Sequence, residues 1–409
     1  MKIAIACNNL AFITGGPRLI FGLAEFLQKL GHQVVIYGPE SGGDFYKDIT
    51  KNLDMRVVTP KMTPPSGEKT KGFIDWVARK IHKERYNIAL AQALANAMDA
   101  DFDVVNVHDF AYRVGYFYKR RNPKTKVVWH ENAPPFAYVK RNNFLRDASG
   151  LVYGIIENFL TKKYFRAMDA VVVLDEFNKQ WSTDAEFKNV TIVRPGIDFD
   201  KFFAPVKDFT AKAARKEMHL LAVGALNAYR RFDNIIEAVR ILHEGGYNAT
   251  VEIVANNIWH EDACRDALVA LVKKYRLENY IQFYFEGMPE TDIIKKFQTC
   301  DVFVQAVYSP PPSHHGWGLV NFEALAAGVP LVVVRSATAT EVLKENENAL
   351  FFEPLNMNEL AHKIKLLADH PDKYKKLAEA GQKYVRENQS WKKYAEEMAA
   401  VFKNALVHN

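Results

Sequence analysis

The stretch Ser309–Pro330, which reads SPPPSHHGWGLVNFEALAAGVP, carries the most informative pattern in this 409-residue sequence. An apolar run, Val302–Val307, comes before it, and another, Leu331–Val334, comes after it. Between these two predicted strands lie a glycine-rich turn and the start of an apolar helix. A strand, a helix and a second strand in this order favour parallel strands joined by a right-handed crossover. The stretch therefore predicts an α/β fold.

The same alternation extends over the rest of the chain. In the first part it predicts a helix at Pro17–Leu30 and strands at Ile3–Cys7, Gln33–Tyr37, Asp103–His108 and Lys126–His130. We expect a second series to begin near Ala170, with helices at Asn234–His243 and Asp262–Tyr275 and strands at Ala170–Leu174, Thr191–Val193, His219–Val223, Val251–Ala255 and Ile281–Phe285. The last part, Asn358–Leu406, reads as helical with a break near Pro371.

Two doubly wound domains fit this length, because a domain typically has about 100–200 residues. We assign residues 1–187 to an N-terminal Rossmann-like domain and residues 188–390 to a C-terminal one. Residues 391–409 are expected to form a terminal helix that packs back on the N-terminal domain.

The composition is that of an ordinary globular protein. Hydrophobic residues make up 48% and charged residues 25%, which excludes collagen-like and disordered chains. Cys7, Cys264 and Cys300 lie far apart and suit reduced thiols better than a disulfide framework or a zinc site. No apolar run approaches the ~20 residues of a membrane span, and Met1–Cys7 does not resemble a signal peptide. We therefore expect a soluble, cytoplasmic protein.

Positive charge is concentrated in one region. Residues 51–150 hold 18 Lys and Arg against 10 Asp and Glu, while the whole chain has a net charge of +6. Such a field attracts anionic partners or lipid headgroups, although solvated surface lysines explain the same excess. Lys140, Arg141 and Arg146 precede the apolar run Leu151–Leu160, so peripheral contact with a membrane is one interpretation. No nucleic acid is expected as a partner, because no groove-reading or base-stacking motif accompanies the charge.

Ligands of doubly wound sheets bind at the carboxyl ends of the strands, so polar residues there are candidates for a binding site. Gly15 and Gly16 precede Pro17 at a predicted helix start, where free N–H groups favour an anion. His108 and His130 each close a predicted strand, and either imidazole can donate to a substrate oxygen. A plain turn and two structural histidines are the alternatives.

The second half offers a similar set. Arg230 and Arg231 follow a predicted strand and can hold phosphate oxygens. Gly316 and Gly318 expose N–H groups at another helix start, again facing an anion. Glu323 lies about one and a half turns into that helix, where a carboxylate suits paired ribose hydroxyls.

Other motifs point away from alternative classes. The Asp-Phe-Asp pairs Asp101–Asp103 and Asp198–Asp200 could hold a divalent cation, but neither has further ligands nearby, and we interpret both as structural. We expect no metal site. The GxGxxG and GxxxxGK[ST] patterns are missing, which disfavours a nicotinamide dehydrogenase and a P-loop NTPase.

Taken together, these segments resemble family 4 of the retaining nucleotide-sugar glycosyltransferases over nearly the whole chain. The run Glu323–Val333, EALAAGVPLVV, is similar to the family's "EAMA.G.PVV" signature. Three shorter likenesses accompany it. Gly15-Gly16 resembles the family's Gly-Gly loop, and Gly31-His32 with Val34 resembles the "GH.V" that follows it. Arg194–Asp198 with Phe202 resembles the "P-G-V-D…F" turn, and Glu341 fits a later glutamate. The resemblance implies a GT-B fold, with two facing Rossmann-like domains, an acceptor domain and then a donor domain, and a cleft between them.

For the N-terminal domain, the resemblance implies that the Gly15–Gly16 loop offers the N–H of Gly16 to the donor diphosphate. His130 would lie near the donor sugar and the reaction centre. His108 matches the second histidine of the family's "H.H" strand end, and Asn106 replaces the first.

For the C-terminal domain, the resemblance implies that Arg230 takes the place of the family's phosphate-binding lysine. Backbone N–H groups for phosphate and sugar, and a carboxylate for ribose, would come from Gly316, Trp317, Gly318, Leu319 and Glu323. The chain departs from the family at three positions. His315 stands where the first glutamate of the E-x7-E motif is expected, Ala225 replaces an arginine for which Arg231 compensates, and Ala337-Thr338 replaces a Gly-Gly pair.

The implied function is retaining transfer of a sugar from a UDP- or GDP-sugar to a hydroxyl of a glycan, a lipid-linked glycan or a small glycoside, as in polysaccharide biosynthesis. The implied reaction needs no metal or other cofactor, and the leaving phosphate takes the acceptor's proton during front-face attack. The implied location is the cytoplasm, with association to the membrane's cytoplasmic face in the lipid-linked case. Two alternatives remain, a GT-B nucleotide-sugar 2-epimerase and a sugar-nucleotide-binding subunit with a degraded site.

Overall fold

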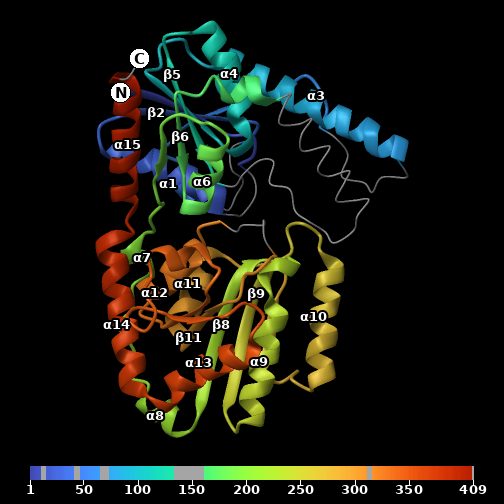
Figure 1. The fold of residues 1–409 in the computed structure, drawn as a ribbon, viewed down its shortest axis with the longest axis vertical. Helices are drawn as coiled ribbons and strands as arrows, with labels where there is room; N and C mark the ends of the chain where they lie inside the picture. Colours follow the sequence, from blue (N-terminus) through green and yellow to red (C-terminus); the bar gives the residue numbers. More distant parts are fainter. Residues whose placement is uncertain (11–14, 41–46, 65–72, 133–160, 311–315, 408–409) are drawn as a thin grey trace. The chain divides into compact units, whose positions relative to one another are not determined.

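The computed structural model describes the chain except for residues 11–14, 41–46, 65–72, 133–160, 311–315 and 408–409. The described residues form two compact units (Figure 1). The first contains Met1–Arg194 and Tyr394–Asn409, and the second contains Pro195–Pro310 and His314–Lys393. Each unit is built on one parallel sheet with helices, which confirms the predicted α/β class.

The first unit has a seven-stranded sheet in the order β3-β2-β1-β4-β5-β6-β7. Its strands are β1 (Lys2–Ala6), β2 (Gln33–Gly38), β3 (Asp54–Val57), β4 (Val104–His108), β5 (Lys126–Glu131), β6 (Ala170–Val173) and β7 (Val190–Ile192). The prediction that a second series begins near Ala170 is wrong, because β6 and β7 continue the first sheet. The edge strand β3 was not predicted, since its alternating charged residues hide the apolar pattern.

Helices of the first unit cover the sheet. They are α1 (Gly15–Lys29), α2 (Lys47–Thr50), α3 (Phe73–Ala97), η2 (Asp109–Ala111), α4 (Tyr112–Arg121), α6 (Glu176–Asp184) and most of α15 (Trp391–Val407). One face of the sheet packs into an apolar core that includes Leu94, Val107 and Trp129. Because side chains alternate along a strand, His108 and His130 lie on the opposite face.

The second unit has a six-stranded sheet in the order β10-β9-β8-β11-β12-β13. The strands are β8 (Glu217–Ala225), β9 (Asn248–Asn256), β10 (Ile281–Tyr284), β11 (Val302–Gln305), β12 (Leu331–Val334) and β13 (Leu350–Phe352). Five of these overlap predicted strands, whereas the three-residue β13 was not predicted. A run of three apolar residues is too short to show a period.

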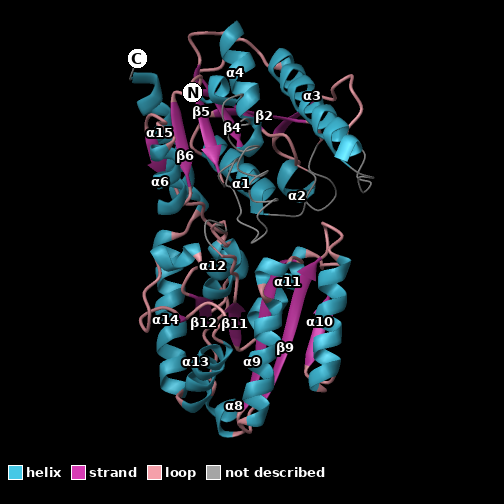
Figure 2. Ribbon diagram, turned by 45° about the vertical axis from the view of Figure 1, so that its right-hand side comes forward, coloured by secondary structure: helices cyan, strands magenta, loops and turns pink. Residues whose placement is uncertain are grey.

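The helices of the second unit flank the parallel strands (Figure 2). They are α7 (Phe199–Phe202), α8 (Thr210–Ala214), α9 (Phe232–Glu244), α10 (Asp262–Tyr275), α11 (Glu290–Thr299), α12 (Leu319–Ala326), α13 (Met357–Asp369) and α14 (Pro371–Asn388). The predicted break near Pro371 is confirmed, because Pro371 begins α14. Proline suits this position, where its missing N–H costs no helical hydrogen bond.

The turn after Arg194 is held tightly against the junction of α14 and α15. The Ile197 N–H donates to the Gln389 carbonyl at 2.9 Å. A Cβ atom on Gly196 would lie 2.1 Å from the carbonyl carbon of Ser390. Only glycine lets the two backbones approach this closely, which gives a packing reason for the Pro-Gly of this turn.

Among the described residues, no helix is long and apolar enough to cross a membrane. The basic residues Lys140, Arg141 and Arg146 and the apolar run Leu151–Leu160 lie outside the described residues.

Candidate functional site

Two histidines of the first unit lie side by side at the carboxyl ends of neighbouring strands. His108 ends β4, and its register partner on the parallel strand β5 is His130. The two ring centroids are 4.6 Å apart, and both side chains are fully buried. The sequence predicted that both residues close strands, and the structure adds that they are direct neighbours.

Hydrogen bonds fix which nitrogen of His108 carries the proton. The Asn106 amide donates to the Val128 carbonyl at 3.1 Å, so its oxygen is the atom 2.8 Å from His108 Nε2. An amide oxygen only accepts, and His108 Nε2 is therefore the protonated nitrogen. His108 Nδ1 keeps its lone pair and has no hydrogen-bond partner in the part of the chain that the structure describes.

His130 is held from the other side of its ring. Its Nδ1 lies 3.2 Å from the hydroxyl of Tyr394 on α15, and its Nε2 has no hydrogen-bond partner among the described residues. Burial lowers the pKa of His130 to about 3. Burial, together with the neighbouring His130, also lowers the pKa of His108 well below its ordinary value. Both rings are thus neutral near pH 7.

A buried carboxyl group follows His130 directly. Glu131 accepts a hydrogen bond from the Ser182 hydroxyl at 2.8 Å through Oε2, while Oε1 has no such partner among the residues described. Burial raises the pKa of Glu131 to about 8, and the nearby Asp109 and Asp175 act in the same direction. Glu131 is therefore mostly protonated at pH 7. Sequence analysis missed it, although its place at the strand end next to His130 was a usable signal.

The other candidate residues of the first unit are Gly15 and Gly16. The helix α1 begins at Gly15, two residues before the predicted start at Pro17. Gly15 is exposed and Gly16 is half-buried. Both lie in the first helical turn after the β1 loop, where backbone N–H groups have no helical acceptor.

In the second unit, Arg230 lies at the carboxyl end of β8. Its side chain crosses Gly224, where an added Cβ would come 3.1 Å from Arg230 Nε. The buried Nε has no hydrogen-bond partner, and no acidic side chain pairs with the guanidinium among the described residues. Within the part of the chain that the structure describes, Arg230 therefore presents a positive charge without an acidic partner at the edge where ligands of such sheets bind.

The neighbouring Arg231 makes contacts that Arg230 does not. Its guanidinium pairs with Asp233 at 2.7 Å and donates to Asn234 at 3.1 Å. Its backbone has a φ of 52° and precedes the first residue of α9. The two adjacent arginines were predicted as one clamp, but the structure assigns Arg231 to the start of α9 and leaves Arg230 available.

The described part of the glycine-rich signature, from Gly316 onward, leads into α12. Gly318 has a φ of 72°, and a Cβ there would lie 2.9 Å from the Asn321 amide, so the position favours glycine. Trp317 is buried and stacks on Phe322 with 5.0 Å between ring centroids. Leu319 is the first residue of α12, as the predicted helix start requires.

The remaining predicted residues of the signature are Glu323, Gly316 and His315. Glu323 lies on α12 and is only 2% exposed. Gly316 is exposed, and a Cβ there would meet no atom within 4 Å. His315 lies outside the described residues.

A backbone hydrogen bond brings the loops after β8 and β11 together. The Tyr308 N–H donates to the Tyr229 carbonyl at 2.8 Å. Arg230 is adjacent to this bond in sequence, and the Gly316–Leu319 segment follows Tyr308 by a few residues. Among the predicted phosphate-binding residues that the structure describes, Arg230 and Gly316–Leu319 thus follow the carboxyl ends of β8 and β11 in one sheet.

Two sequence families match the chain and together cover most of it. The family described as "Glycosyltransferase Family 4" matches residues 13–201, and the family described as "Glycosyl transferases group 1" matches residues 206–384. The chain belongs to these glycosyltransferases. The resemblance read from the glycine-rich signature is confirmed.

Individual relatives are distant. YtcC of Bacillus subtilis is 24% identical over 67% of this chain and 65% of its own length, so the chain spans slightly less than two thirds of that relative. The alpha-1,3/1,6-mannosyltransferase ALG2 of Candida glabrata is 22% identical over 84% of this chain and 78% of ALG2. Among solved structures, HepE of Anabaena in complex with UDP has a TM-score of 0.73 at 15% identity, covering 99% of this chain and 100% of HepE. This similarity shows that the two proteins share the GT-B fold.

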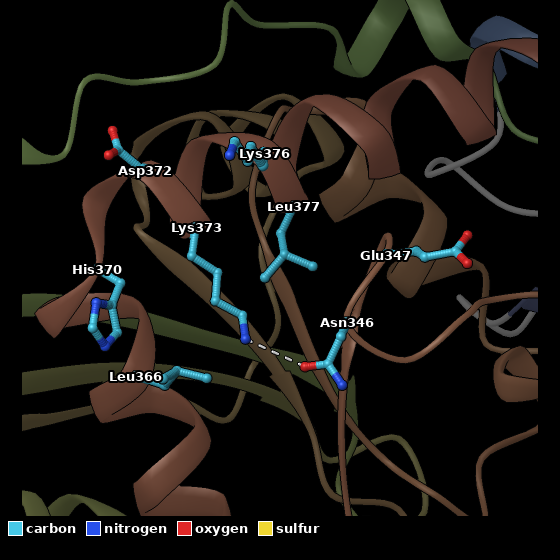
Figure 3. A pocket seen from close by; sticks show the side chains of 8 residues that line it. All are labelled: Asn346, Glu347, Leu366, His370, Asp372, Lys373, Lys376 and Leu377. Carbon is cyan, nitrogen blue, oxygen red and sulfur yellow. Dashed lines mark hydrogen bonds between the residues drawn. The ribbon is translucent and has the colours of Figure 1, made fainter.

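A surface pocket of the second unit lies away from these residues. It has a volume of about 500 Å3 and is lined by Asn346, Glu347, Leu366, His370, Asp372, Lys373, Lys376 and Leu377. In this glycosyltransferase, Asn346 and Glu347 precede β13, so the pocket lies at the amino edge of the sheet. Figure 3 shows Lys373 reaching toward Asn346, whose amide oxygen lies 3.4 Å from Lys373 Nζ.

The Asp-Phe-Asp pairs make structural contacts. Asp103 accepts from the Lys2 N–H at 2.7 Å, and Asp101 pairs with the Lys2 ammonium. Asp198 accepts from the Lys201 N–H at the start of α7. Both observations agree with the structural interpretation of the pairs.

The shifted pKa values of Glu131 and His130 predict opposite effects of pH on stability. The Glu131 pKa rises from 4.5 to about 8 on folding. Between these values the unfolded state loses its proton while the folded state keeps it, so the free energy of unfolding falls as pH rises. The His130 pKa falls from 6.5 to about 3 on folding. Between these values the unfolded state binds a proton that the folded state does not, so the free energy of unfolding falls as pH decreases.

We expect Glu131→Gln to abolish the decrease in the free energy of unfolding that Glu131 causes as pH rises, since glutamine mimics the protonated acid. Relative to wild type, the variant should gain on the order of a few kcal/mol in the free energy of unfolding between pH 5 and pH 8. Urea denaturation at several pH values measures this difference. The exposed Glu379→Gln is the matched control, and parallel curves for wild type and Glu131→Gln would contradict the assignment.

Proposed function

We propose that this glycosyltransferase moves a hexosyl group, with retention of configuration, from a nucleotide sugar to a hydroxyl group of an acceptor. The donor is a UDP- or GDP-sugar, and the acceptor is a glycan, a lipid-linked glycan or a small glycoside. The observation that carries this proposal is Arg230, a cation without an acidic partner among the described residues at the carboxyl edge of the second sheet. The UDP complex of HepE and the mannosyl transfer named for ALG2 support a nucleotide donor and a hexosyl group.

Arg230 and the α12 start would hold the donor's diphosphate. The guanidinium offers donors in a planar fork that suits phosphate oxygens. Gly316, Trp317 and Gly318 precede α12, so their N–H groups and that of Leu319 lie where a helix favours an anion. Glu323 would accept hydrogen bonds from ribose hydroxyls.

The reaction places negative charge on the leaving phosphate and positive character on the sugar ring. Preorganised donors stabilise such charge without rearrangement at the moment of reaction. The leaving phosphate oxygen takes the proton of the attacking hydroxyl as the new glycosidic bond forms. His108 and His130 are neutral, so they serve as hydrogen-bonding groups for sugar hydroxyls rather than as charged acids.

One rival is a subunit that binds a sugar nucleotide without transferring the sugar. Ala225 favours this reading, because it stands where the family carries a second phosphate-binding arginine, and Arg231 is engaged with Asp233. Donor binding without transfer to any of a broad panel of acceptors would support the rival.

A thermal-shift screen of UDP- and GDP-sugars tests donor binding. A ligand present at 100 times its dissociation constant stabilises the folded protein by about 2.7 kcal/mol, and we expect one such compound to raise the melting temperature. The same compound should give little or no shift with Glu323→Ala, while the exposed Glu379→Ala should respond like wild type. If no nucleotide sugar shifts the wild-type protein, the proposed donor class is wrong.

The different contacts of the two arginines predict different kinetics. Arg230→Ala should lower kcat by about 10²–10³-fold with the donor found in the screen, as for loss of one preorganised donor to a developing charge. Arg231→Ala should lower the melting temperature more and kcat less, because it removes the pair with Asp233. Steady-state assays of nucleoside diphosphate release measure both. Equal losses of kcat in the two variants would contradict the assignment of Arg230.

A further inference from the structure

The last helix of the chain sends one side chain to the histidine pair. Tyr394 of α15 is fully buried, and its hydroxyl lies 3.2 Å from Nδ1 of His130. The two residues are 264 positions apart in sequence but belong to the same compact unit. Their ring centroids are 6.1 Å apart, so the contact is made by the hydroxyl and not by ring stacking.

The chemistry of this pair sets the direction of the hydrogen bond. Burial, with Asp109 nearby, raises the pKa of Tyr394 well above its ordinary value, so the phenol keeps its proton. The neutral imidazole of His130 offers a lone pair on one nitrogen. A phenolic O–H is a stronger donor than a neutral imidazole N–H, and an imidazole nitrogen is a stronger acceptor than a phenolic oxygen. Tyr394 therefore donates to His130 Nδ1, which leaves the imidazole proton on Nε2.

This tautomer makes the two neighbouring rings complementary. His108 has its proton on Nε2, bonded to Asn106, and keeps a lone pair on Nδ1. His130 presents the opposite function, an N–H donor at Nε2. Neither His108 Nδ1 nor His130 Nε2 has a hydrogen-bond partner among the described residues, and a buried polar atom without a partner is unfavourable. A hydroxyl group both accepts and donates, whereas a phosphate ester oxygen only accepts.

We propose that Tyr394 is a positioning residue that holds the proton of His130 on Nε2, so that His130 donates to, and His108 accepts from, a hydroxyl group of the substrate. The proposal rests on the proposed function for the identity of that substrate, a sugar-bearing donor or acceptor. The assignment of the proton itself does not depend on any activity.

The opposite arrangement has a different consequence. If His130 Nδ1 donated to the tyrosine oxygen, His130 Nε2 and His108 Nδ1 would both carry lone pairs. Two acceptors cannot stabilise a developing negative charge. Among the described residues, the side chains recorded in contact with the His130 ring are His108 on β4 and Tyr394 on α15, and neither is a cation.

Nitrogen-15 NMR of the full-length protein tests the tautomer directly. With histidine labelled, the long-range proton–nitrogen pattern distinguishes Nε2–H from Nδ1–H, and the signals lost in His130→Gln identify His130. We expect the Nε2–H pattern for His130 in wild type and a mixed or reversed pattern in Tyr394→Phe. An Nδ1–H pattern in wild type would overturn the proposal, even if Tyr394→Phe does not fold.

Tyr118→Phe is the matched control. Tyr118 is also a fully buried tyrosine of the first unit, and its hydroxyl donates to the Asp99 carbonyl at 2.7 Å. Both variants lose one buried hydroxyl, but only Tyr394→Phe should change the His130 pattern. An unchanged His130 pattern in Tyr394→Phe would also overturn the proposal.

Kinetics and ligand titration complete the test. We expect Tyr394→Phe to lower kcat about 10–100-fold with little change in KM for the nucleotide sugar, while Tyr118→Phe retains wild-type kcat. A shift of the His130 signal with nucleotide sugar alone would assign the hydroxyl to the donor, and a shift that needs acceptor would assign it to the acceptor. If no nucleotide sugar binds at all, the proposed function fails, whereas the wild-type tautomer still decides the role of Tyr394.

Discussion

Parallel strand pairing is the constraint on which the candidate sites depend. In the first sheet it makes His108 and His130 register partners, so their rings lie 4.6 Å apart. Burial then removes water from both rings and keeps them neutral. Asn106 and Tyr394 each hold one ring by a single nitrogen, and the remaining nitrogens stay buried without partners among the described residues. A site formed in this way suits neutral, hydroxyl-bearing groups.

In the second sheet, the candidate residues also follow the carboxyl ends of parallel strands, but they include a cation in place of neutral rings. The loops after β8 and β11 meet through the Tyr308–Tyr229 backbone bond, and they bring a cation and a helix start to one edge. Gly224 is small enough for the Arg230 side chain to cross it, while Asp233 neutralises Arg231. Of these two arginines, only Arg230 lacks an acidic partner among the described residues, and a cation in this state suits an anionic diphosphate. Each unit thus carries its own candidate site, with neutral hydrogen-bonding groups in the first unit and a cation beside a helix start in the second.

Sequence patterns predicted most of this fold, because buried parallel strands are short apolar runs that end in polar residues. The sequence patterns also predicted His108, His130 and Arg230 as site residues, because each polar side chain closes or follows such a run. They did not find Tyr394, since a residue 264 positions from its partner leaves no local pattern. The different contacts of Arg231 were also beyond the sequence, because two adjacent arginines look alike until their side chains are placed.

Hydrogen–deuterium exchange with and without the nucleoside diphosphate of the donor tests the central claim most directly, because it reports where the anion binds. The account predicts slower exchange of backbone amides in Gly224–Phe232 and Gly316–Glu323, with no change around Asn346 and Lys373. Protection confined to the pocket at Asn346 and Lys373, or no protection in either loop, would contradict it.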